Sequence, residues 1–379
     1  MILQVEKFQE QCKKILGAVD TDSALKNTTF GYDTLELEAN GKALHLNVSN
    51  KEYYVSISLP LEEEATLRAV VDAKLFLALI SKVTTKTIEL TTTDVALVVK
   101  ANGTYKFPLK YDVDSMVILP KILVSNPTSN FVVSGVTLNS ILANNSREIN
   151  PDSTKEVQKL YYLDQEGCIT FTNSSACVNS FTLVTSTKML LTPKLVKLFK
   201  LFKDGDVKVT VGFEDVGGIA QMRVLFEQGD VTITAILTND QDKFNKVPAT
   251  LIRTRANKAF NFSVVFDKKE FVEALDRLLL FDTTNNLNKG LGIFDFNYDS
   301  VTIKDAKAIN SETIAYASVL TTCDSEDAMK YTANFDLEVI KDILSNLDVQ
   351  TFTLSYGDNQ VAVLTGGNVR NVITQKVIR

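Results

Sequence analysis

The 379-residue chain repeats one order of elements three times, and this repeat limits its possible folds more than any single motif does. Apolar residues at helical spacing predict six well-separated helices. These helices span Glu6–Ala18, Asp72–Val83, Thr137–Ile149, Thr192–Lys203, Asp267–Leu280 and Phe335–Asn346. Between the helices, apolar and polar residues alternate, which predicts strands. The clearest strands span Leu44–Leu59, Ile88–Val99, Val207–Val211, Val231–Ile236, Val301–Ile303 and Phe352–Leu354.

The spacing of the helices gives the length of the repeat. The first helix of each copy begins at residue 6, 137 or 267, so successive copies start 131 and 130 residues apart. A repeat of this length indicates structurally similar units. We therefore predict an α+β protein of three similar domains, each with two helices packed on antiparallel sheets, over residues 1–126, 127–252 and 253–379. The expected joints are Ser125–Asn130, which is rich in turn formers, and Pro248–Asn261.

Composition places the chain among folded proteins of a reducing compartment. Hydrophobic residues make up 45% and charged residues 23%, as in ordinary globular proteins. Four cysteines lie far apart and form no Cys-x-x-Cys pair, namely Cys12, Cys168, Cys177 and Cys323. The first residues lack the pattern of a signal peptide, and the apolar runs are too short to span a bilayer. We expect a cytoplasmic protein with no membrane partner.

The sequence offers little from which to build a catalytic site. Its one histidine, His45, falls on the polar face of a predicted strand, where a solvated strand residue is the ordinary interpretation. One histidine builds neither a Ser-His-Asp triad nor a histidine-rich metal site. The glycine-rich loops that bind nucleotide phosphates are missing from the sequence as well. We predict a protein that is not an enzyme, with no catalytic residues, metal or cofactor; magnesium-dependent chemistry by carboxylates alone stays open.

The net charge of −6 hides a difference between helices and the rest of the chain. The six predicted helices hold 14 basic and 11 acidic residues, whereas the remainder holds 26 basic and 35 acidic residues. The bias is strongest in Thr192–Lys203, where four lysines stand on one side and apolar residues on the other. These lysines are Lys194, Lys197, Lys200 and Lys203. Such a face either keeps a helix soluble or contacts the phosphates of DNA, which needs cations but no base-reading geometry.

Several short segments, in their order along essentially the whole chain, resemble the bacterial-type sliding clamp, the DNA polymerase III beta subunit family. Val71–Phe76 is similar to the family's second helix of domain one, and Ala101–Leu109 to its closing edge strand. Leu160–Leu163 resembles a Tyr-Tyr-Leu segment of domain two. Leu191–Lys194 resembles the entry to that domain's second helix, and Phe244–Pro248 the stretch before domain three.

The resemblance implies the DNA clamp fold in a head-to-tail homodimeric ring that encloses duplex DNA, with helices lining the hole. Such a ring is a DNA replication protein, a processivity factor that slides on DNA and tethers the replicative DNA polymerase. Its implied partners are double-stranded DNA, the polymerase, an ATP-driven clamp loader and other proteins with a clamp-binding motif. Basic helices and an acidic remainder fit a basic hole within an acidic rim. The alternative is a clamp-fold scaffold for protein interactions that does not encircle DNA.

The resemblance and the charge pattern together give three sets of candidate residues. The expected DNA-binding residues are Lys13, Lys14, Lys26, Lys74, Arg147, Tyr161, Tyr162, Lys194, Lys197, Lys200 and Lys203. The implied partner-peptide pocket comprises Leu163, Thr172, Ser174, Ser175, Cys177, Lys246, Val247, Val372 and Ile373. The implied dimer interface joins Phe107 and Leu109 to Leu279 and Leu280.

The chain departs from the family's usual residues at two places in the pocket. The family commonly has Thr-Asp-Gly-His-Arg-Leu where this chain has Thr172–Cys177, and its usual Met-Pro-Met-Arg-Leu ending is replaced by residues 374–379. The resemblance therefore does not give the peptide preference. Leu163, Val247 and Ile373 have ordinary core positions as an equal alternative.

Overall fold

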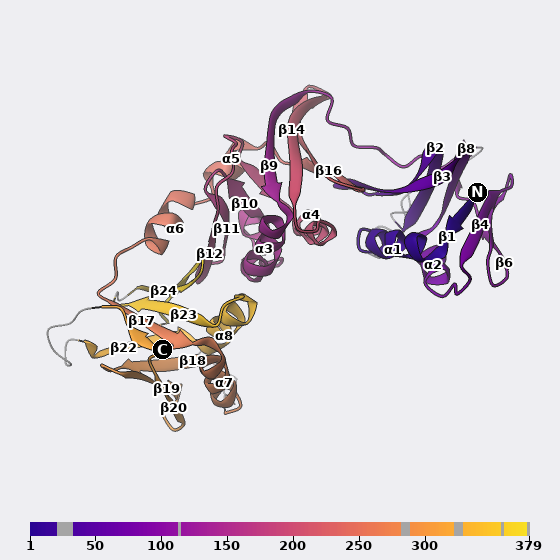
Figure 1. The fold of residues 1–379 in the computed structure, drawn as a ribbon. Helices are drawn as coiled ribbons and strands as arrows, with labels where there is room; N and C mark the ends of the chain where they lie inside the picture. The colour runs from indigo at the N-terminus through magenta and orange to yellow at the C-terminus, as the bar shows by residue number, and fades with distance from the viewer. Residues whose placement is uncertain (21–32, 113–114, 282–288, 322–328, 358–359, 377–379) are drawn as a thin grey trace. The chain divides into compact units, whose positions relative to one another are not determined.

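The computed structural model describes residues 1–20, 33–112, 115–281, 289–321, 329–357 and 360–376. These residues form two compact units (Figure 1). The first unit contains residues 1–138 and 194–239, and the second contains residues 139–193 and 240–379. None of the described helices is long and apolar enough to cross a membrane.

The first unit contains two antiparallel sheets and a short hairpin, β7 (Tyr111–Asp112) with β8 (Ser115–Met116). One sheet has the order β1-β4-β5-β6, and its strands are β1 (Ile2–Gln4), β4 (Thr87–Thr92), β5 (Ala96–Lys100) and β6 (Thr104–Pro108). The other has the order β2-β3-β16-β15-β14-β9. Its strands are β2 (Thr34–Ser49), β3 (Tyr53–Asp72), β16 (Val231–Leu237), β15 (Ile219–Gln228), β14 (Asp206–Val216) and β9 (Pro127–Ser134).

The second unit is built on a nine-stranded antiparallel sheet of order β13-β10-β11-β12-β25-β24-β23-β17-β21. Its strands are β13 (Met189–Leu191), β10 (Tyr161–Asp164), β11 (Gly167–Phe171), β12 (Ser175–Ser180), β25 (Val369–Thr374), β24 (Val361–Gly366), β23 (Thr351–Tyr356), β17 (Phe262–Asp267) and β21 (Ser318–Val319). A further sheet has the order β20-β19-β18-β22. Its strands are β20 (Ser311–Ala315), β19 (Ser300–Asp305), β18 (Leu291–Phe296) and β22 (Tyr331–Asp336).

All six predicted helices are present, with small shifts at their ends. They are α1 (Val5–Leu16), α2 (Ala73–Ile80), α3 (Gly135–Asn145), α4 (Pro193–Lys197), α7 (Lys268–Leu279) and α8 (Leu337–Asn346). The helix predicted over 192–203 divides into α4 and a 3-10 turn, η4 (Leu198–Leu201). Two more 3-10 turns are η2 (Ser146–Glu148) and η3 (Glu156–Lys159). Two short helices, α5 (Gln241–Asn245) and α6 (Ala249–Ala256), were not predicted, and α6 lies in the expected joint at 248–261.

The strand order repeats three times, as the spacing of the helices predicted. The strand that precedes the first helix of each copy pairs with the first of the three strands that follow the second helix, and those three strands continue the sheet in chain order. This gives the orders β1-β4-β5-β6, β9-β14-β15-β16 and β17-β23-β24-β25. The three similar domains are therefore present as a topological repeat, while the exact boundaries 1–126, 127–252 and 253–379 stay a prediction.

Aspartate side chains cap the first turns of three helices, α2, α7 and α8. Asp72, Asp267 and Asp336 accept hydrogen bonds from the backbone N–H three residues later, at 2.7, 2.9 and 3.1 Å. Each carboxylate thus satisfies a backbone donor that has no partner within the helix, which stabilises a helix by about 1 kcal/mol. Helices α7 and α8 then lie side by side against their sheets (Figure 1). Their buried faces include Phe271, Leu275 and Ile340.

Candidate functional site

A small cavity in the second unit lies where α6 crosses the edges of strands β11, β12 and β25. Its volume is about 120 Å³. It is lined by Phe171, Thr172, Asn173, Ser175, Ala176, Pro248, Leu251, Ile252, Arg255, Val372 and Thr374. The strands form its floor, because Ala176 and Val372 stand directly opposite each other across the β12–β25 pair. Helix α6 forms one wall and buries Ile252 against the same apolar cluster.

Three of the predicted pocket residues, Thr172, Ser175 and Val372, line this cavity. Ser175 stands opposite Ile373 and reaches the cavity as the first residue of β12, whereas alternation separates Val372 from the other predicted strand residues. Cys177 and Ile373 belong to the apolar core on the opposite side of the sheet from Val372, because each is one residue away from a cavity-facing position. Leu163 and Val247 are buried, so their core interpretation is the one that the structure favours. Ser174 and Lys246 are exposed residues outside the lining.

Hydroxyl groups order the turn between β11 and β12 at the mouth of the cavity. Thr172 Oγ1 accepts hydrogen bonds from the backbone N–H groups of Ser174 and Ser175, both at 3.1 Å. Thr374 Oγ1 donates to the carbonyl of Ser174 at 2.9 Å, which ties the turn to the end of β25. A turn held by its own side chains in this way keeps a fixed shape. The polar rim of the cavity is therefore formed before any partner arrives.

A buried ion pair supports the floor from below. The Glu148 side chain is 1% exposed, and Arg147 beside it is 17% exposed; the Arg147 guanidinium lies 2.9 Å from the Glu148 carboxylate. The Ser175 hydroxyl donates a hydrogen bond to the same carboxylate. We predicted Arg147 as a DNA contact, but its guanidinium is occupied by Glu148 and lies 3.9 Å from Asp342. The charge of Arg147 is thus paired inside the fold.

A second arginine fixes α6 above the sheet. Arg253 donates to both carboxylate oxygens of Asp164 at 2.9 and 2.6 Å and lies 3.4 Å from Glu166. Burial would lower the pKa of Arg253, but the bonds to Asp164 outweigh this and raise it. Two parallel hydrogen bonds between a guanidinium and a carboxylate fix the orientation of the two side chains as well as their distance. Arg253 thereby positions its neighbours Leu251 and Arg255 on the cavity wall.

Sequence reasoning missed most of the lining because it missed α6. Pro248, Leu251, Ile252 and Arg255 come from this helix or its start. The sequence does contain a signal for this helix, since the apolar Ile252 and Ala256 are four residues apart and follow a proline, a residue that often begins a helix. Phe171, Asn173, Ala176 and Thr374 were missed for a different reason. They are immediate neighbours of residues that were predicted.

The lysine face of the predicted 192–203 helix is present in the first unit. Leu195, Leu198, Phe199 and Phe202 are buried, and Lys197, Lys200 and Lys203 are exposed. Two other predicted cations are engaged within the fold. Lys194 lies 2.9 Å from Asp20, and Lys14 lies 2.7 Å from Asp230.

The remaining predicted DNA contacts divide between exposed and buried positions. Lys13 and Lys74 are exposed, and Lys203, although 3.6 Å from Glu10, keeps 76% of its side chain in solvent. Lys26 lies outside the described residues. Tyr161 and Tyr162 are only 2% and 5% exposed, so their rings have no face for DNA. Burial, followed by the charge of Asp164, raises the pKa of Tyr162 to about 12, which keeps the buried hydroxyl protonated.

Two sheets end in outer strands near the residues predicted for a dimer interface. Strand β6 is an outer strand of the first sheet, but its Phe107 packs edge-to-face on Phe76 with ring centroids 5.3 Å apart, and Leu109 is buried as well. Strand β20 is the outer strand of the β20-β19-β18-β22 sheet, close to α7. At the end of α7, Leu279 is half-buried and Leu280 is 78% exposed. Leu280 is thus the predicted interface side chain with the most surface to offer.

Comparison with solved structures identifies the fold. The structure matches the DNA polymerase sliding clamp from Bacillus subtilis with a TM-score of 0.78 at 14% identity, covering 100% of this chain and 99% of that chain. It matches a DnaN sliding clamp from Pseudomonas aeruginosa bound to griselimycin with a TM-score of 0.81 at 14% identity and the same coverage. The beta subunit from the DNA polymerase of Streptococcus pyogenes gives a TM-score of 0.78 at 15% identity, again with that coverage.

These matches show that the whole chain has the sliding-clamp fold, as the sequence resemblance implied. By sequence, no protein-family model matches the chain, and a search of curated proteins also finds no match. At such low identity the fold is shared, while the function has to be argued from the chain's own residues.

Proposed function

We propose that this chain is a DNA sliding clamp, a processivity factor whose two copies form a ring around duplex DNA and tether a replicative polymerase. The observation that carries the proposal is the threefold strand order, which matches sliding clamps over the full length of the chain. The activity is mechanical, so it needs no catalytic residues, cofactor or metal. A clamp loader that opens the ring, other proteins with a clamp-binding motif and a cytoplasmic location belong to the same proposal.

The proposed DNA surface is centred on the exposed lysines of α4 and η4. Lys197, Lys200 and Lys203 project from an element whose opposite face is anchored by Phe199 and Phe202. Lysine ammonium groups on flexible stems bind phosphates as point charges without fixing a base sequence, which suits a protein that slides. We include the exposed Lys13 of α1 and Lys74 of α2 in the proposed DNA contacts, whereas Arg147, Tyr161 and Tyr162 are left out because they are buried or paired.

Replacing Lys197, Lys200 and Lys203 by serine should weaken DNA binding and its salt dependence. Each lost phosphate contact lowers the slope of log K against log salt by about 0.9, so we expect the slope to fall by two to three units. The measurement is fluorescence anisotropy of a labelled duplex over a salt series.

The matched control replaces three lysines that lie outside α4 and η4 and have acidic neighbours. Lys100, Lys121 and Lys208 lie 3.2, 3.0 and 3.7 Å from Glu89, Glu38 and Glu227. Their replacement removes the same charge and should leave the slope within one unit of the parent. If both triple variants behave alike, the effect is one of net charge and the α4–η4 surface is not the contact.

The proposed ring closes by pairing between outer strand β6 of one copy and outer strand β20 of the next. Outer strands carry backbone donors and acceptors that a second chain satisfies. The exposed Leu280 and Phe281, at the end of the α7 that packs on β20, add apolar surface beside this strand. Because the two joined surfaces differ, two copies close head to tail into a ring.

Mass measurement in solution tests the ring. We expect twice the chain mass of 41.9 kDa for the parent protein and a shift toward one chain mass for Leu280→Asp, since a buried charge without a partner is costly. Val184→Asp serves as the control, because Val184 is 84% exposed and belongs to neither outer strand. A monomer at high concentration for the parent protein would rule out the ring and favour the scaffold alternative.

The cavity under α6 is the proposed docking site for a short peptide from the polymerase or the loader. Its apolar floor at Ala176 and Val372 suits an apolar anchor, and Arg255 on its rim suits an acidic or carboxyl group nearby. The scaffold alternative would use the same cavity without DNA. Binding of peptide and of duplex DNA by the same protein separates the two functions.

A further inference from the structure

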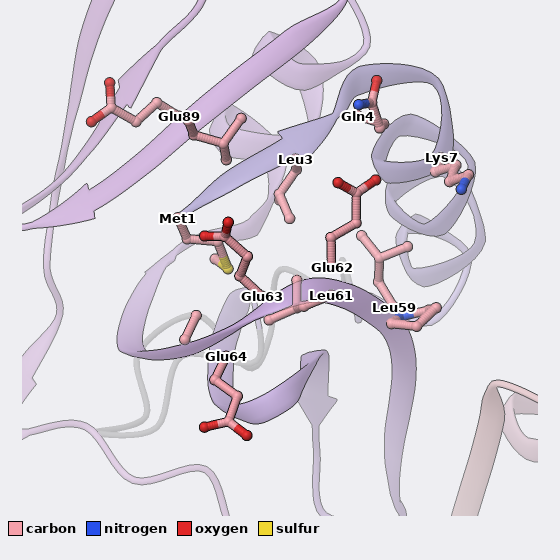
Figure 2. A pocket seen from close by; sticks show the side chains of 13 residues that line it. Met1, Leu3, Gln4, Lys7, Leu59, Leu61, Glu62, Glu63, Glu64 and Glu89 are labelled. Carbon is pink, nitrogen blue, oxygen red and sulfur yellow. The ribbon is translucent and has the colours of Figure 1, made fainter.

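A second cavity, unrelated to the peptide site, opens beside strand β1 in the first unit (Figure 2). Its volume is about 500 Å³. It lies between residues 1–4, which include β1, and residues 59–65, which belong to β3. Its lining consists of Met1, Ile2, Leu3, Gln4, Lys7, Leu59, Pro60, Leu61, Glu62, Glu63, Glu64, Ala65 and Glu89. The buried Leu3 and Leu59 give it an apolar base. Strand β1 is one of the two outer strands of its sheet, at the opposite edge from β6.

The hydrogen bonds of β1 show which of its backbone groups point into the cavity. Met1 and Leu90 exchange backbone bonds at 3.0 and 2.8 Å, and the Val5 N–H donates to Lys86 at 3.0 Å. In an antiparallel pair, bonding to one neighbour alternates along the strand. Ile2 and Gln4 therefore direct their N–H groups away from β4, toward the cavity. The Ile2 carbonyl points the same way.

The third copy of the repeat shows that this fold accepts a strand at the same place. Strand β17 corresponds to β1, since it pairs with β23 as β1 pairs with β4. On its other side β17 pairs with the two-residue strand β21, in the register Val264↔Val319 and Val265↔Ser318. In the first copy, the corresponding side of β1 faces the cavity. A short extended segment beside this strand thus has a structural precedent within this chain, where the third copy supplies it from its own residues.

The charges around the cavity indicate what kind of segment would enter it. Figure 2 shows Glu62 reaching toward Gln4 and Glu63 beside Met1, while Glu64 points away from β1. Lys7 and the Met1 ammonium are the basic groups of the lining. The Glu89 carboxylate forms an ion pair with the Lys100 ammonium at 3.2 Å. The wall opposite β1 is therefore acidic. It would attract a basic segment and repel the phosphates of DNA.

We infer that the edge of β1 binds an extended basic segment of a partner protein, which adds to the sheet as a fifth strand. Ile2 and Gln4 supply the main-chain bonds, and Glu62 and Glu63 receive lysine or arginine side chains. In strand addition of this kind, main-chain bonds give affinity and alternate side chains give selectivity. This site is independent of the proposed clamp function, because it uses neither the α4–η4 lysines nor the cavity under α6.

The test measures binding of a fluorescent capped peptide of alternating valine and lysine to the full chain without DNA. At low ionic strength we expect it to bind at least tenfold more tightly than a peptide of alternating valine and glutamate, with the difference shrinking as salt is added. Equal binding of the two peptides would overturn the inference. Self-association at β1 that displaces the peptide would also overturn it, since a second copy would then be the occupant.

Matched variants separate the main-chain bonds from the charges. Ile2→Pro removes an N–H that faces the cavity, not β4, and should weaken peptide binding about fivefold, whereas Ile2→Ala should not. Glu62→Gln with Glu63→Gln should weaken it about tenfold, and Glu64→Gln should have a smaller effect. Thermal melts check that each variant is folded. If Ile2→Pro is folded and binds as well as Ile2→Ala, strand addition is wrong.

Discussion

We expect the protein to stay on nicked circular DNA through a high-salt gel-filtration column and to leave the same DNA once it is linear. A ring that encloses DNA is held by topology, so salt that breaks the lysine–phosphate contacts does not release it from a circle. On linear DNA the ring slides off the ends. We expect the retained fraction to differ by at least about tenfold, since salt removes nearly all binding that depends on phosphate contacts alone.

The controls act on DNA ends and leave the protein unchanged. Cutting the loaded circle once with a restriction enzyme should release the protein, and blocking the ends of a linear duplex with a bound bulky protein should retain it. Circles are loaded by raising the protein from low to high concentration in their presence, so that rings assemble around the DNA. Equal retention on open linear and circular DNA would contradict the ring mechanism, even if the lysine surface binds phosphate as proposed.

The threefold fold was predictable from sequence because its causes are local. Helix spacing and strand alternation record which face of each element is buried, and Asp72, Asp267 and Asp336 mark three helix starts directly. The division of the 192–203 helix into α4 and η4 was not predictable. Residues spaced by three stand on one side of a 3-10 turn as well as on a helix, so the lysine pattern alone does not distinguish them.

The partners of charged residues could not be predicted, because they come from distant parts of the chain. Lys14 was predicted as a DNA contact, but its ammonium bonds Asp230, which is 216 residues away in the sequence. The partner of Arg147 was also not predictable from the sequence, but for a different reason. Its partner Glu148 is adjacent in sequence, but only folding shows that the pair is buried. A sequence gives the number of charges, and the fold decides which of them face the solvent.

The cavity under α6 shows where a family resemblance loses detail. The resemblance pointed to the β12 and β25 segments that form the floor, but it also included Cys177 and Ile373 from the other face of the sheet. A shift of one residue along a strand moves a side chain to the opposite face. The strand period alone would have separated these residues from Val372. The α6 wall was missed because Pro248 was interpreted as part of a joint and not as the start of a helix.

Glu148→Ala should lower the free energy of unfolding of the protein by about 3 kcal/mol. The substitution leaves the Arg147 charge largely buried without its carboxylate, and it removes the acceptor of the Ser175 hydroxyl. Breaking a buried ion pair from one side costs more than the pair contributes, because the remaining charge has lost its solvation. Urea unfolding followed by circular dichroism measures the loss.

A double variant distinguishes an unpaired charge from a missing contact. Arg147→Met with Glu148→Leu fills the same space with apolar side chains and should recover most of the stability lost in Glu148→Ala. Peptide binding under α6 need not recover with it, since Ser175, which lines that cavity, still lacks its acceptor. Recovery of stability without recovery of binding would show that the pair acts on the cavity through the Ser175 hydroxyl. If the double variant is as unstable as Glu148→Ala, the stabilising role lies in the shape of these side chains and not in their charges.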